Sequence, residues 1–575
     1  MLKYFIVSTT LMFSVIGCSS YNDAKQVSSV VGEIKDTDSW YSDTNYDVRT
    51  IKLDIPTPNR SKCASYDNEN GIERACTLED IVHDRDGYDS YKPELSVLIS
   101  ADGLNPTTEN ATLKLRGDYS RKSTLGNDDY EEDAKVKSYA IKLVSKTDLL
   151  WKQRKIQLAK YKSDTTRVKN RLAFDLMREI PNITSIKLQF VNLFINDIDY
   201  GLYTNAEAIR EEYLVNRGWN KDDKLYNAGN CMFEPLDELR VDAKGQPLDP
   251  EAFNTVLEIR TGDDHSNVMK MMQAIYSDTP IDVVIEKYFN RENYITWLAV
   301  NLVLSNKDTT YHNFYLYNPL HSETFYFIPW DYDGAWATKN YLGKNEYGIS
   351  VWWKTLLHKK FMSVPKNLKD IYAKADYLRA NYITDEKVRE KLALYKESVM
   401  KFSQQEPDSL FTSSNSWESM TEKLVVGIEN NVKLYKEVIG HPMPFWQALE
   451  YKDDILRVVW EKSIDLEGDD IVYDVHVSKD INFLSDDVFN ATDIEKLEYS
   501  QNIHLEAGIY FLKVISKEKK DPSHYQISFT RARDENNKNT IHAPSSTRFG
   551  VLEFEIDENG DLSFENESNL LQEWE

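Results

Sequence analysis

Polar residues between Asn306 and Gly334 have types and spacings that suit the binding of metal and phosphate. Asp308 and Asn313 stand in a D-x-x-x-x-N arrangement, and Asp331 and Asp333 follow after one connecting strand. Phosphoryl transfer needs a carboxylate that orients the attacking hydroxyl, and an asparagine and a second carboxylate that hold divalent cations against the phosphates. Such hard oxygen ligands suit Mg²⁺ or Mn²⁺. The spacing therefore predicts a metal site for phosphoryl transfer.

Taken alone, the spacing of Asp308 and Asn313 carries little weight, because it occurs by chance in most long chains. The competing interpretation is a capped helix end followed by an Asp-rich turn, and the motif alone does not decide between the two. The order of the parts is more specific. Protein kinases place this Asp and Asn on a loop after a helix, and a metal-binding Asp, an aromatic residue and a glycine follow one β-hairpin later.

Helices and strands around these polar residues must position them. The periodicity of apolar residues predicts where those helices and strands lie. Before the segment, strands are predicted at 48–55, 95–99, 112–116 and 139–143, an acidic turn at 127–133, a helix over 165–179, and a hairpin of 186–195 and 201–204 that turns at Asn196-Asp197. Helices are predicted at 206–216, 267–276, 280–289, 292–306, 385–404 and 416–438, and short strands at 314–317 and 324–328. This order predicts an α+β fold with the two lobes of a protein kinase.

The character of the chain changes after His441-Pro-Met-Pro. Alternating residues predict strands near 456–461, 472–477 and 508–515. An early Trp460 and a late Tyr510 resemble a fibronectin type III β-sandwich over 449–530. Residues 531–575 are predicted to add a β extension and an acidic tail.

The N-terminus reads as a targeting segment. Lys3 precedes an apolar stretch that is too short to span a membrane, and Val15-Ile-Gly-Cys18 matches a bacterial lipobox. Residues 1–18 are therefore predicted to be a lipoprotein signal peptide with Cys18 lipidated; the alternative is an ordinary secretory signal with a chance cysteine. Polar residues 19–47 read as a flexible tether. The predicted location is the cell envelope, lipid-anchored at the outer membrane or cell surface.

Composition limits the possible functions. A formal net charge of −25 argues against general nucleic-acid binding, because the surface would repel a polyanion. Hydrophobic residues make up 41% and aromatic residues 12% of the chain, which is enough for a buried core. In an oxidising compartment Cys63 and Cys76 are spaced for a local disulfide, which leaves Cys231 as a buried thiol. Zinc is not expected, because CxxC and Cys/His clusters are missing from the sequence.

The chain resembles the CotH family of atypical kinases, named after spore coat protein H, over about residues 48–440. The strongest match is the pair of motifs that contain the predicted metal site, Asn306-Lys-Asp308…Asn313-Phe-Tyr and Pro329-Trp-Asp331-Tyr-Asp333. Departures are Asp118-Tyr119 in place of Asn-Ser, Lys169 in place of Arg, and Asp in place of Gly after Asn196. Supporting matches are Leu115-Arg116-Gly117, Lys137-Ser-Tyr139, Asp164 through Lys169-Asn170, Phe194-Ile-Asn196 and Tyr200-Gly201 through Glu207.

The resemblance implies ATP-dependent phosphorylation of protein Ser or Thr with Mg²⁺ or Mn²⁺. It implies that Asp308 is the catalytic carboxylate and Asp331 the main metal ligand. Asn313 and Asp333 are implied to help with the metal. The implied partner is a protein substrate, exported or at the surface, with the membrane reached through the lipid anchor.

Four residues are candidates for nucleotide binding. Lys137 is the first choice for the phosphate-binding lysine, and Lys142, on the other face of the same strand, is the alternative. Arg116 either binds phosphate or is a surface arginine in a turn. Glu207 falls near the position of a kinase hinge, where it either meets adenine or ribose or starts a helix.

Two other functions remain open on the sequence. A non-catalytic adhesion or matrix-organising surface protein would keep the fold, the lipobox and the sandwich, and it needs no ATP outside the cytoplasm. Metal-dependent transfer from a non-nucleotide phosphate substrate would use the same carboxylates.

Overall fold

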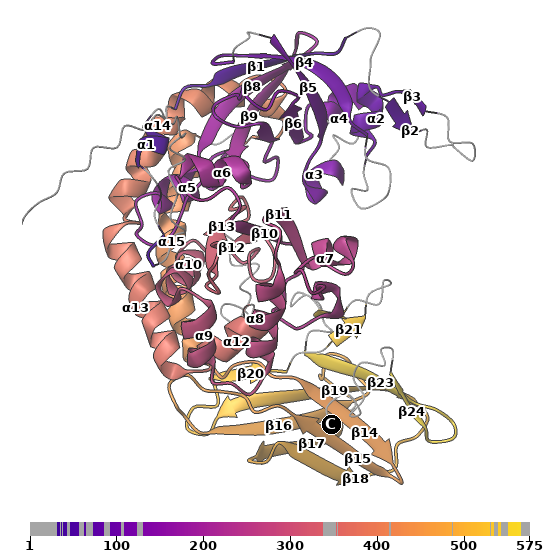
Figure 1. Ribbon diagram of the computed structural model, residues 1–575. Coiled ribbons are helices and arrows are strands. Elements are labelled where there is room, and N and C mark those ends of the chain that lie inside the picture. Colours follow the sequence, from indigo (N-terminus) through magenta and orange to yellow (C-terminus); the bar gives the residue numbers. More distant parts are fainter. Residues whose placement is uncertain are drawn as a thin grey trace, which may run out of the picture.

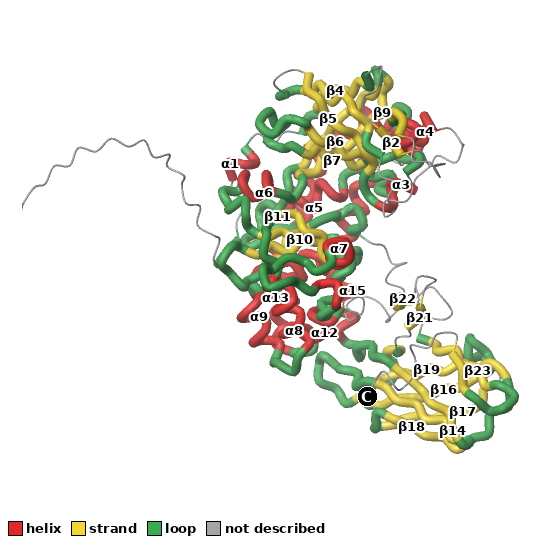
Figure 2. The backbone as a smooth tube through the Cα atoms, turned by 45° about the vertical axis from the view of Figure 1, so that its right-hand side comes forward, coloured by secondary structure: helices red, strands yellow, loops and turns green. Residues whose placement is uncertain are grey.

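The computed structural model shows three bodies in a row, a β-barrel, a helical lobe and a β-sandwich (Figure 1). Figure 2 places the barrel and the sandwich at opposite ends of the helical lobe. None of the helices in the described part has the length and apolar character needed to cross a bilayer. The predicted signal peptide with Cys18 lies outside that part. The residues described are 32–34, 36, 38–42, 46–56, 62–64, 73–84, 93–104, 108–122, 130–336, 352, 355–412, 416–485, 487–528, 531–533, 539–541 and 550–564.

The barrel is closed, with strand order β1-β4-β5-β6-β7-β9-β8. Parallel pairing of β1 with β8, with Ile51 opposite Leu193, closes the ring. Alternate residues point inward and form an apolar core that includes Leu53, Leu113 and Ile141. The strands are β1 (Arg49–Asp54), β4 (Leu95–Ala101), β5 (Thr108–Leu115), β6 (Tyr139–Leu143), β7 (Lys155–Ala159), β8 (Leu188–Ile195) and β9 (Ile198–Glu207), with α2 (Leu78–Val82), α3 (Asp118–Lys122), α4 (Tyr130–Ala134) and the ribbon β2 (Lys62–Ala64)–β3 (Glu73–Ala75) beside them.

Local sequence patterns predicted most of the barrel. The hairpin of β8 and β9 is confirmed, and Asn196 and Asp197 at its turn have φ of 50° and 64°, as a type I′ turn requires. The acidic turn at 127–133 is corrected, because the described residues from Tyr130 form helix α4. The helix predicted at 206–216 begins too early, because Glu207 still pairs with Ile156 of β7. Strand β7 was not predicted.

The helical lobe is built around α10 (Arg291–Val303), which is buried on every side from Asn293 onward. A helix enclosed in this way fixes its C-terminal end firmly, and that end leads straight into the loop with Asp308. The sheet beside it has the order β11-β10-β12-β13. Its strands are β10 (Lys224–Ala228), β11 (Leu257–Thr261), β12 (Phe314–Asn318) and β13 (Tyr326–Pro329), and the helices include α5 (Lys169–Met177), α6 (Glu211–Asn216), α7 (Pro250–Val256), α8 (Ser266–Tyr276), α9 (Ile281–Tyr288), α12 (Leu356–Met362), α13 (Pro365–Asn381), α14 (Asp385–Ser403) and α15 (Trp417–Ile439).

The segment before the barrel differs from the predicted flexible tether over 19–47. Helix α1 (Asp38–Tyr41) buries Trp40 and Tyr41, and Ile34 is buried in the core of the helical lobe. The Ile34 amide donates to Asn182 Oδ1 at 2.8 Å. The tether prediction is therefore wrong for this part, because three large apolar side chains outweigh the polar composition.

The C-terminal body has two antiparallel sheets around one core. The first has the order β14-β15-β18, and the described strands of the second run β17-β16-β19-β23-β24, with β20 paired to β19. The second sheet extends past the predicted boundary at 530, because β23 pairs with β19. The fibronectin type III assignment stays a prediction. The strands are β14 (Gln447–Lys452), β15 (Ile455–Trp460), β16 (Ile471–Ser478), β17 (Asp487–Ile494), β18 (Glu498–Asn502), β19 (Gly508–Glu518), β20 (Tyr525–Ile527), β23 (Val551–Ile556) and β24 (Leu562–Phe564), and β21 (Arg531–Arg533) pairs with β22 (Asn539–Ile541).

The sandwich is fastened to the helical lobe. Met443 and Leu466 are buried in the core of the helical lobe. Lys359 Nζ on α12 lies 2.8 Å from Glu461 Oε2, just after β15. A shared core and an ion pair at the same junction hold the two bodies in a fixed arrangement.

The cysteines follow the predicted division. Cys76 is disulfide-bonded, and Cys231 is free and buried. Strands β2 and β3 place the backbone of Cys63 opposite Arg74. The side chain of Cys63 lies outside the described part, so its pairing with Cys76 stays a prediction.

A buried carboxylate joins the barrel to the segment between α14 and α15 of the helical lobe. Asp408, in the turn Asp408–Leu410 between α14 and α15, accepts from the Leu202 amide at 2.6 Å. Its Oδ1 lies 3.2 Å from Lys160 Nζ and 3.3 Å from Arg167 Nη1. A Cβ on Gly201, where φ is +74°, would lie 2.0 Å from Asp408 Oδ2, so only glycine fits there.

Replacing Asp408 by alanine should lower the free energy of unfolding by about 3–5 kcal/mol, because Lys160 and Arg167 would keep buried charges without their anion. Urea denaturation of the full chain measures the change. Asp237→Ala is the matched control, since that side chain is 90% exposed, and it should change the free energy by less than about 0.5 kcal/mol. Equal losses in the two variants would contradict the assignment.

Candidate functional site

The loop after α10 brings Asp308 and Asn313 into direct contact. Asn313 Nδ2 donates to Asp308 Oδ2 and to the Asp308 carbonyl, each at 2.9 Å. His312 Nε2 lies 3.0 Å from Asp308 Oδ1. The side chain of Asp308 remains 54% exposed, so the loop orients the carboxylate and still leaves it accessible to a ligand.

The turn with Asp331 and Asp333 is fixed from beneath by buried hydrogen bonds. The Tyr332 amide donates to Asn170 Oδ1 at 2.8 Å, and the Tyr332 hydroxyl donates to Asn301 Oδ1 at 2.7 Å. Asn170 lies on α5 and Asn301 on α10, so two helices hold the turn. The buried Tyr332 thus anchors the turn between its two aspartates.

Nearby positive charge compensates the two aspartates only in part. Burial raises the pKa of Asp331, Arg116 opposes this, and Asp308 adds to the rise. Burial followed by the charge of Asp331 holds the pKa of Asp333 well above its usual range, and Asp308 contributes in the same sense. Carboxylates that repel one another in this way are stabilised by a cation between them.

The donor set fits a metal that arrives with phosphates. In the described part of the chain, no group of three or more His, Cys, Asp or Glu side chains is arranged so that it could hold a metal ion. Mg²⁺ and Mn²⁺ do not require one, because Mg²⁺ usually binds through one or two carboxylates together with water and substrate phosphates. Asp331, Asp333 and the amide oxygen of Asn313 supply ligands of that type.

A cavity of about 140 Å³ lies between the barrel and this turn. Asp331 and Asp333 line one wall. Arg116 and Gly117, which follow β5, line another, and a phosphate-binding role for Arg116 stays a prediction. The other lining residues are Ser120, Val136, Ser138 and Ala159 through Ser163.

The predicted lysines do not reach this cavity. Lys137 is buried, and its ammonium donates to the Arg121 carbonyl at 2.7 Å. Lys142 is exposed on the outer face of β6. The lysines that line the cavity are Lys160 and Lys162, and the sequence interpretation named neither. Their position just before the motif with Asp164 and Asn170 was the available signal.

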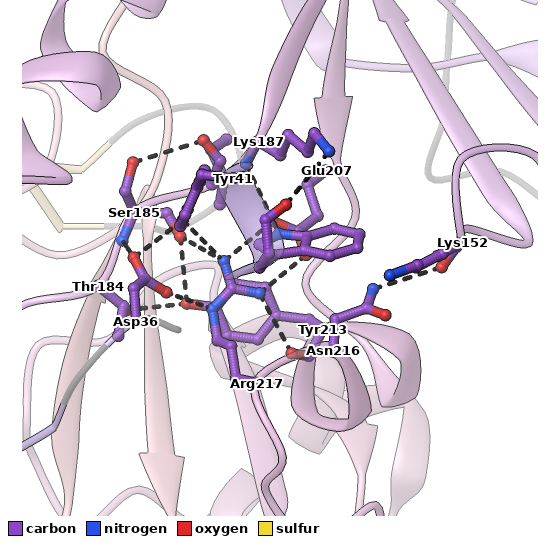
Figure 3. Close-up of polar contacts among 12 residues, drawn as sticks. Asp36, Tyr41, Lys152, Thr184, Ser185, Lys187, Glu207, Tyr213, Asn216 and Arg217 are labelled. Atoms are coloured by element: carbon purple, nitrogen blue, oxygen red, sulfur yellow. Dashed lines mark hydrogen bonds and ion pairs between the residues drawn. The ribbon is translucent and has the colours of Figure 1, made fainter. Parts of the chain in front are cut away.

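Glu207 lies in a buried cluster of charges away from the cavity lining (Figure 3). Arg217 donates to Glu207 Oε1 and Oε2 at 2.8 and 3.0 Å. Oε2 also accepts from the Lys187 amide at 2.9 Å and from Trp40 Nε1 at 3.2 Å. Both carboxylate oxygens are thus engaged, and the predicted contact with adenine or ribose is corrected to a structural role.

Arg217 also ties the N-terminal segment to this junction. Its Nε donates to Asp36 Oδ1 at 2.5 Å, and its guanidinium lies 3.5 Å from the centre of the Tyr213 ring. Burial opposes the charge of Arg217, but Glu207, Tyr213 and Asp36 outweigh that effect, so its pKa is raised well above its usual range. The guanidinium is therefore a permanent charge at the connection between barrel and helical lobe.

The segments that resemble CotH motifs therefore lie close together in the structure. Comparison with known proteins shows which family the chain belongs to. The family described as CotH kinase protein matches residues 113–435, more than half of the chain. The chain belongs to the CotH family. It is 28% identical over 215 residues to Inner spore coat protein H of Bacillus subtilis (strain 168), a match that covers 36% of this chain and 56% of that protein. The CotH match runs from β5 of the barrel into α15, so it includes both walls of the cavity.

Replacing Glu207 by glutamine should lower the free energy of unfolding by about 1–3 kcal/mol, because Arg217 loses a charged partner in a buried site. Nucleotide-induced thermal stabilisation of this variant should match that of the wild type. Glu211→Gln is the control, since Glu211 is exposed on the neighbouring helix α6. If the Glu207→Gln protein kept wild-type stability but was no longer stabilised by nucleotide, Glu207 would be a nucleotide ligand after all.

Buried His358 supports the Asp308 loop and should make its stability depend on pH. His358 Nε2 donates to the Thr310 carbonyl at 2.9 Å, and Nδ1 accepts from the Tyr294 hydroxyl at 2.6 Å. Burial lowers the pKa of His358 to about 3. Between pH 6.5 and about 3 the unfolded chain binds the extra proton, so stability falls as the pH falls.

His358→Gln removes this proton uptake. The slope of unfolding free energy against pH between 6 and 4.5 should decrease by close to one proton, or about 1.4 kcal/mol per pH unit. Denaturant unfolding at several pH values measures the slope. His321→Gln is the control because His321 is exposed, and an equal change of slope in both variants would rule out the assignment.

Proposed function

We propose that this CotH-family chain is an atypical two-lobe kinase that transfers the γ-phosphate of ATP to Ser or Thr of a protein. The observation that carries the proposal is that Asp308, held by Asn313, lies beside Gly334 and acts on the charges of Asp331 and Asp333, which line a cavity together with Arg116. These residues come from the loop after α10, the turn after β13 and the barrel segment after β5. Carboxylates for an acceptor hydroxyl and for a metal, close to a phosphate-binding cation, are the parts that phosphoryl transfer requires.

Each residue has a task that follows from its surroundings. Asp308 is accessible, and Asn313 and His312 fix its orientation, so it can accept the proton of an acceptor hydroxyl. Asp331 and Asp333, with Asn313, would hold Mg²⁺ or Mn²⁺. The bound metal would neutralise negative charge on the phosphates. Arg116 faces the same cavity and would bind a phosphate oxygen.

We further propose that the protein is an exported lipoprotein, anchored through Cys18 at the cell envelope, and that its substrate is another exported or surface protein. The lipobox supports the anchor, and a disulfide at Cys76 supports an oxidising compartment. The C-terminal sandwich, which we propose is of the fibronectin type III kind, would bind or position a partner.

One observation favours a second candidate, a non-catalytic surface protein. The ammonium of Lys160, at the cavity wall, donates to the Tyr200 carbonyl at 2.6 Å and pairs with Asp408. A lysine held in this way is a structural element of the fold, which leaves Arg116 and Lys162 as the other cationic side chains that line the cavity. In a non-catalytic protein, binding of a surface partner would be unchanged when both Asp308 and Asp331 are replaced.

Asp331→Asn should abolish the thermal stabilisation that ATP with Mn²⁺ or Mg²⁺ gives the wild type, because a ligand that binds only the folded state raises stability. Asp308→Asn should keep that stabilisation and lose phosphoryl transfer by about 100-fold or more. The assays are differential scanning fluorimetry and transfer of labelled phosphate by purified residues 19–575. Equal labelling by the wild type and Asp331→Asn would refute the kinase proposal.

A further inference from the structure

Tyr161 lines the cavity two residues after the end of β7. Its backbone is held on both sides, since the Lys160 amide donates to Ser138 Oγ at 3.0 Å and the Asp164 amide donates to the Tyr161 carbonyl at 3.0 Å. The φ of Tyr161 is 46°, in the left-handed region that is unfavourable for a residue with a side chain. Strain of this kind persists where surrounding contacts fix it, and it is found most often at ligand-binding and active sites.

Asn170 determines the direction of the hydrogen bond to Tyr161. Asn170 lies on α5 and is buried. The Tyr332 amide, which can only donate, contacts Asn170 Oδ1 at 2.8 Å. The other end of the Asn170 side chain is therefore its NH₂ group, and this group donates to the Tyr161 hydroxyl oxygen. A hydroxyl that accepts from an amide keeps its own hydrogen for a different acceptor.

The hydrogen of the Tyr161 hydroxyl is left for the cavity. Among the described residues, no side chain or backbone oxygen accepts it. Burial, followed by the charge of Asp331, raises the pKa of Tyr161 well above its usual range, although Arg116 opposes the rise. The hydroxyl therefore keeps its hydrogen at neutral pH. A donor in such surroundings requires an acceptor oxygen, and a ligand in the cavity would supply one.

We propose that Tyr161 is a further ligand-binding residue of this site, whose hydroxyl donates to an oxygen of the phosphoryl group held beside Asp331 and Asp333. This rests on the proposed function, because that function places a phosphoryl group there. Asn170 contacts both the Tyr161 hydroxyl and the amide of Tyr332, the residue between the two aspartates. The Asn170 side chain thus fixes the hydroxyl relative to the metal turn and sets the direction of its hydrogen.

Tyr161→Phe removes the hydroxyl and keeps the ring. Isothermal titration of the full-length chain with ATP and Mg²⁺, and separately with inorganic phosphate and Mg²⁺, measures the effect. Each probe that binds the wild type should bind the variant at least about tenfold more weakly, since a hydrogen bond to a charged group is worth about that factor. The melting temperature should also fall, because the Asn170 amide loses its acceptor.

Tyr226→Phe is the matched control for stability. The Tyr226 hydroxyl is buried and shares a hydrogen bond with His265 Nδ1 at 2.9 Å, and neither residue lines the cavity. This variant should also lower the melting temperature, but the affinity for each probe should stay unchanged. If both variants lost affinity to the same extent, the loss would follow from lower stability, and the role of Tyr161 would be overturned.

Asn170→Asp tests the direction of the hydrogen. The variant keeps an acceptor for the Tyr332 amide, but its second carboxylate oxygen takes the hydrogen of the Tyr161 hydroxyl. Because the added charge itself repels the ligand, the comparison is made within this background. Adding Tyr161→Phe to Asn170→Asp should weaken binding by less than about twofold, since the two changes remove the same hydrogen bond to the ligand. A further loss of about tenfold would contradict the proposal.

The two probes separate the role of Tyr161 from the kinase proposal. If the wild type binds phosphate with Mg²⁺ but not ATP, and Tyr161→Phe weakens that binding, the kinase proposal fails and the role of Tyr161 stands. If ATP binds the wild type and Tyr161→Phe equally, the kinase proposal stands and the role of Tyr161 is overturned. A wild type that binds neither probe overturns both.

Discussion

The arrangement of the cleft depends on the buried guanidinium of Arg217. It joins Asp36 before the barrel, Glu207 at the end of β9 and the Ser185 carbonyl before β8. The chain passes from barrel to helical lobe through this point, so the direction in which it leaves the barrel is set here. Removal of one partner would leave a charge buried without compensation, which the fold can relieve only by opening the junction.

The wall of the cavity that carries Asp331 and Asp333 concentrates negative charge. Burial raises the pKa of both carboxyl groups, and the charge of Asp308 adds to the rise in each. The folded chain therefore carries unfavourable electrostatic energy at this wall, which a bound cation would relieve.

Local patterns in the sequence predicted what local geometry determines. The alternation in β1, β4 and β6, the turn at Asn196-Asp197 and the spacing of Asp308 to Asn313 all depend on neighbours in the chain. The roles of other residues depend on distant partners. Glu207 meets Arg217 and Trp40, and Lys160 meets Asp408, which lies more than 200 residues away along the chain. Periodicity and spacing carry no information about such pairs.

The contacts between the sandwich and the helical lobe determine how far the sandwich lies from the Asp308 loop. Met443 and Leu466 share the apolar core of the helical lobe, and Lys359 pairs with Glu461 beside them. Helix α15 spans 23 residues, or about 35 Å, and Asn431 Nδ2 on it donates to the Val303 carbonyl at the end of α10. Helix α15 thus separates the sandwich from the Asp308 loop by its own length. If the sandwich binds the proposed substrate protein, the bound segment and the acceptor hydroxyl must lie about that far apart.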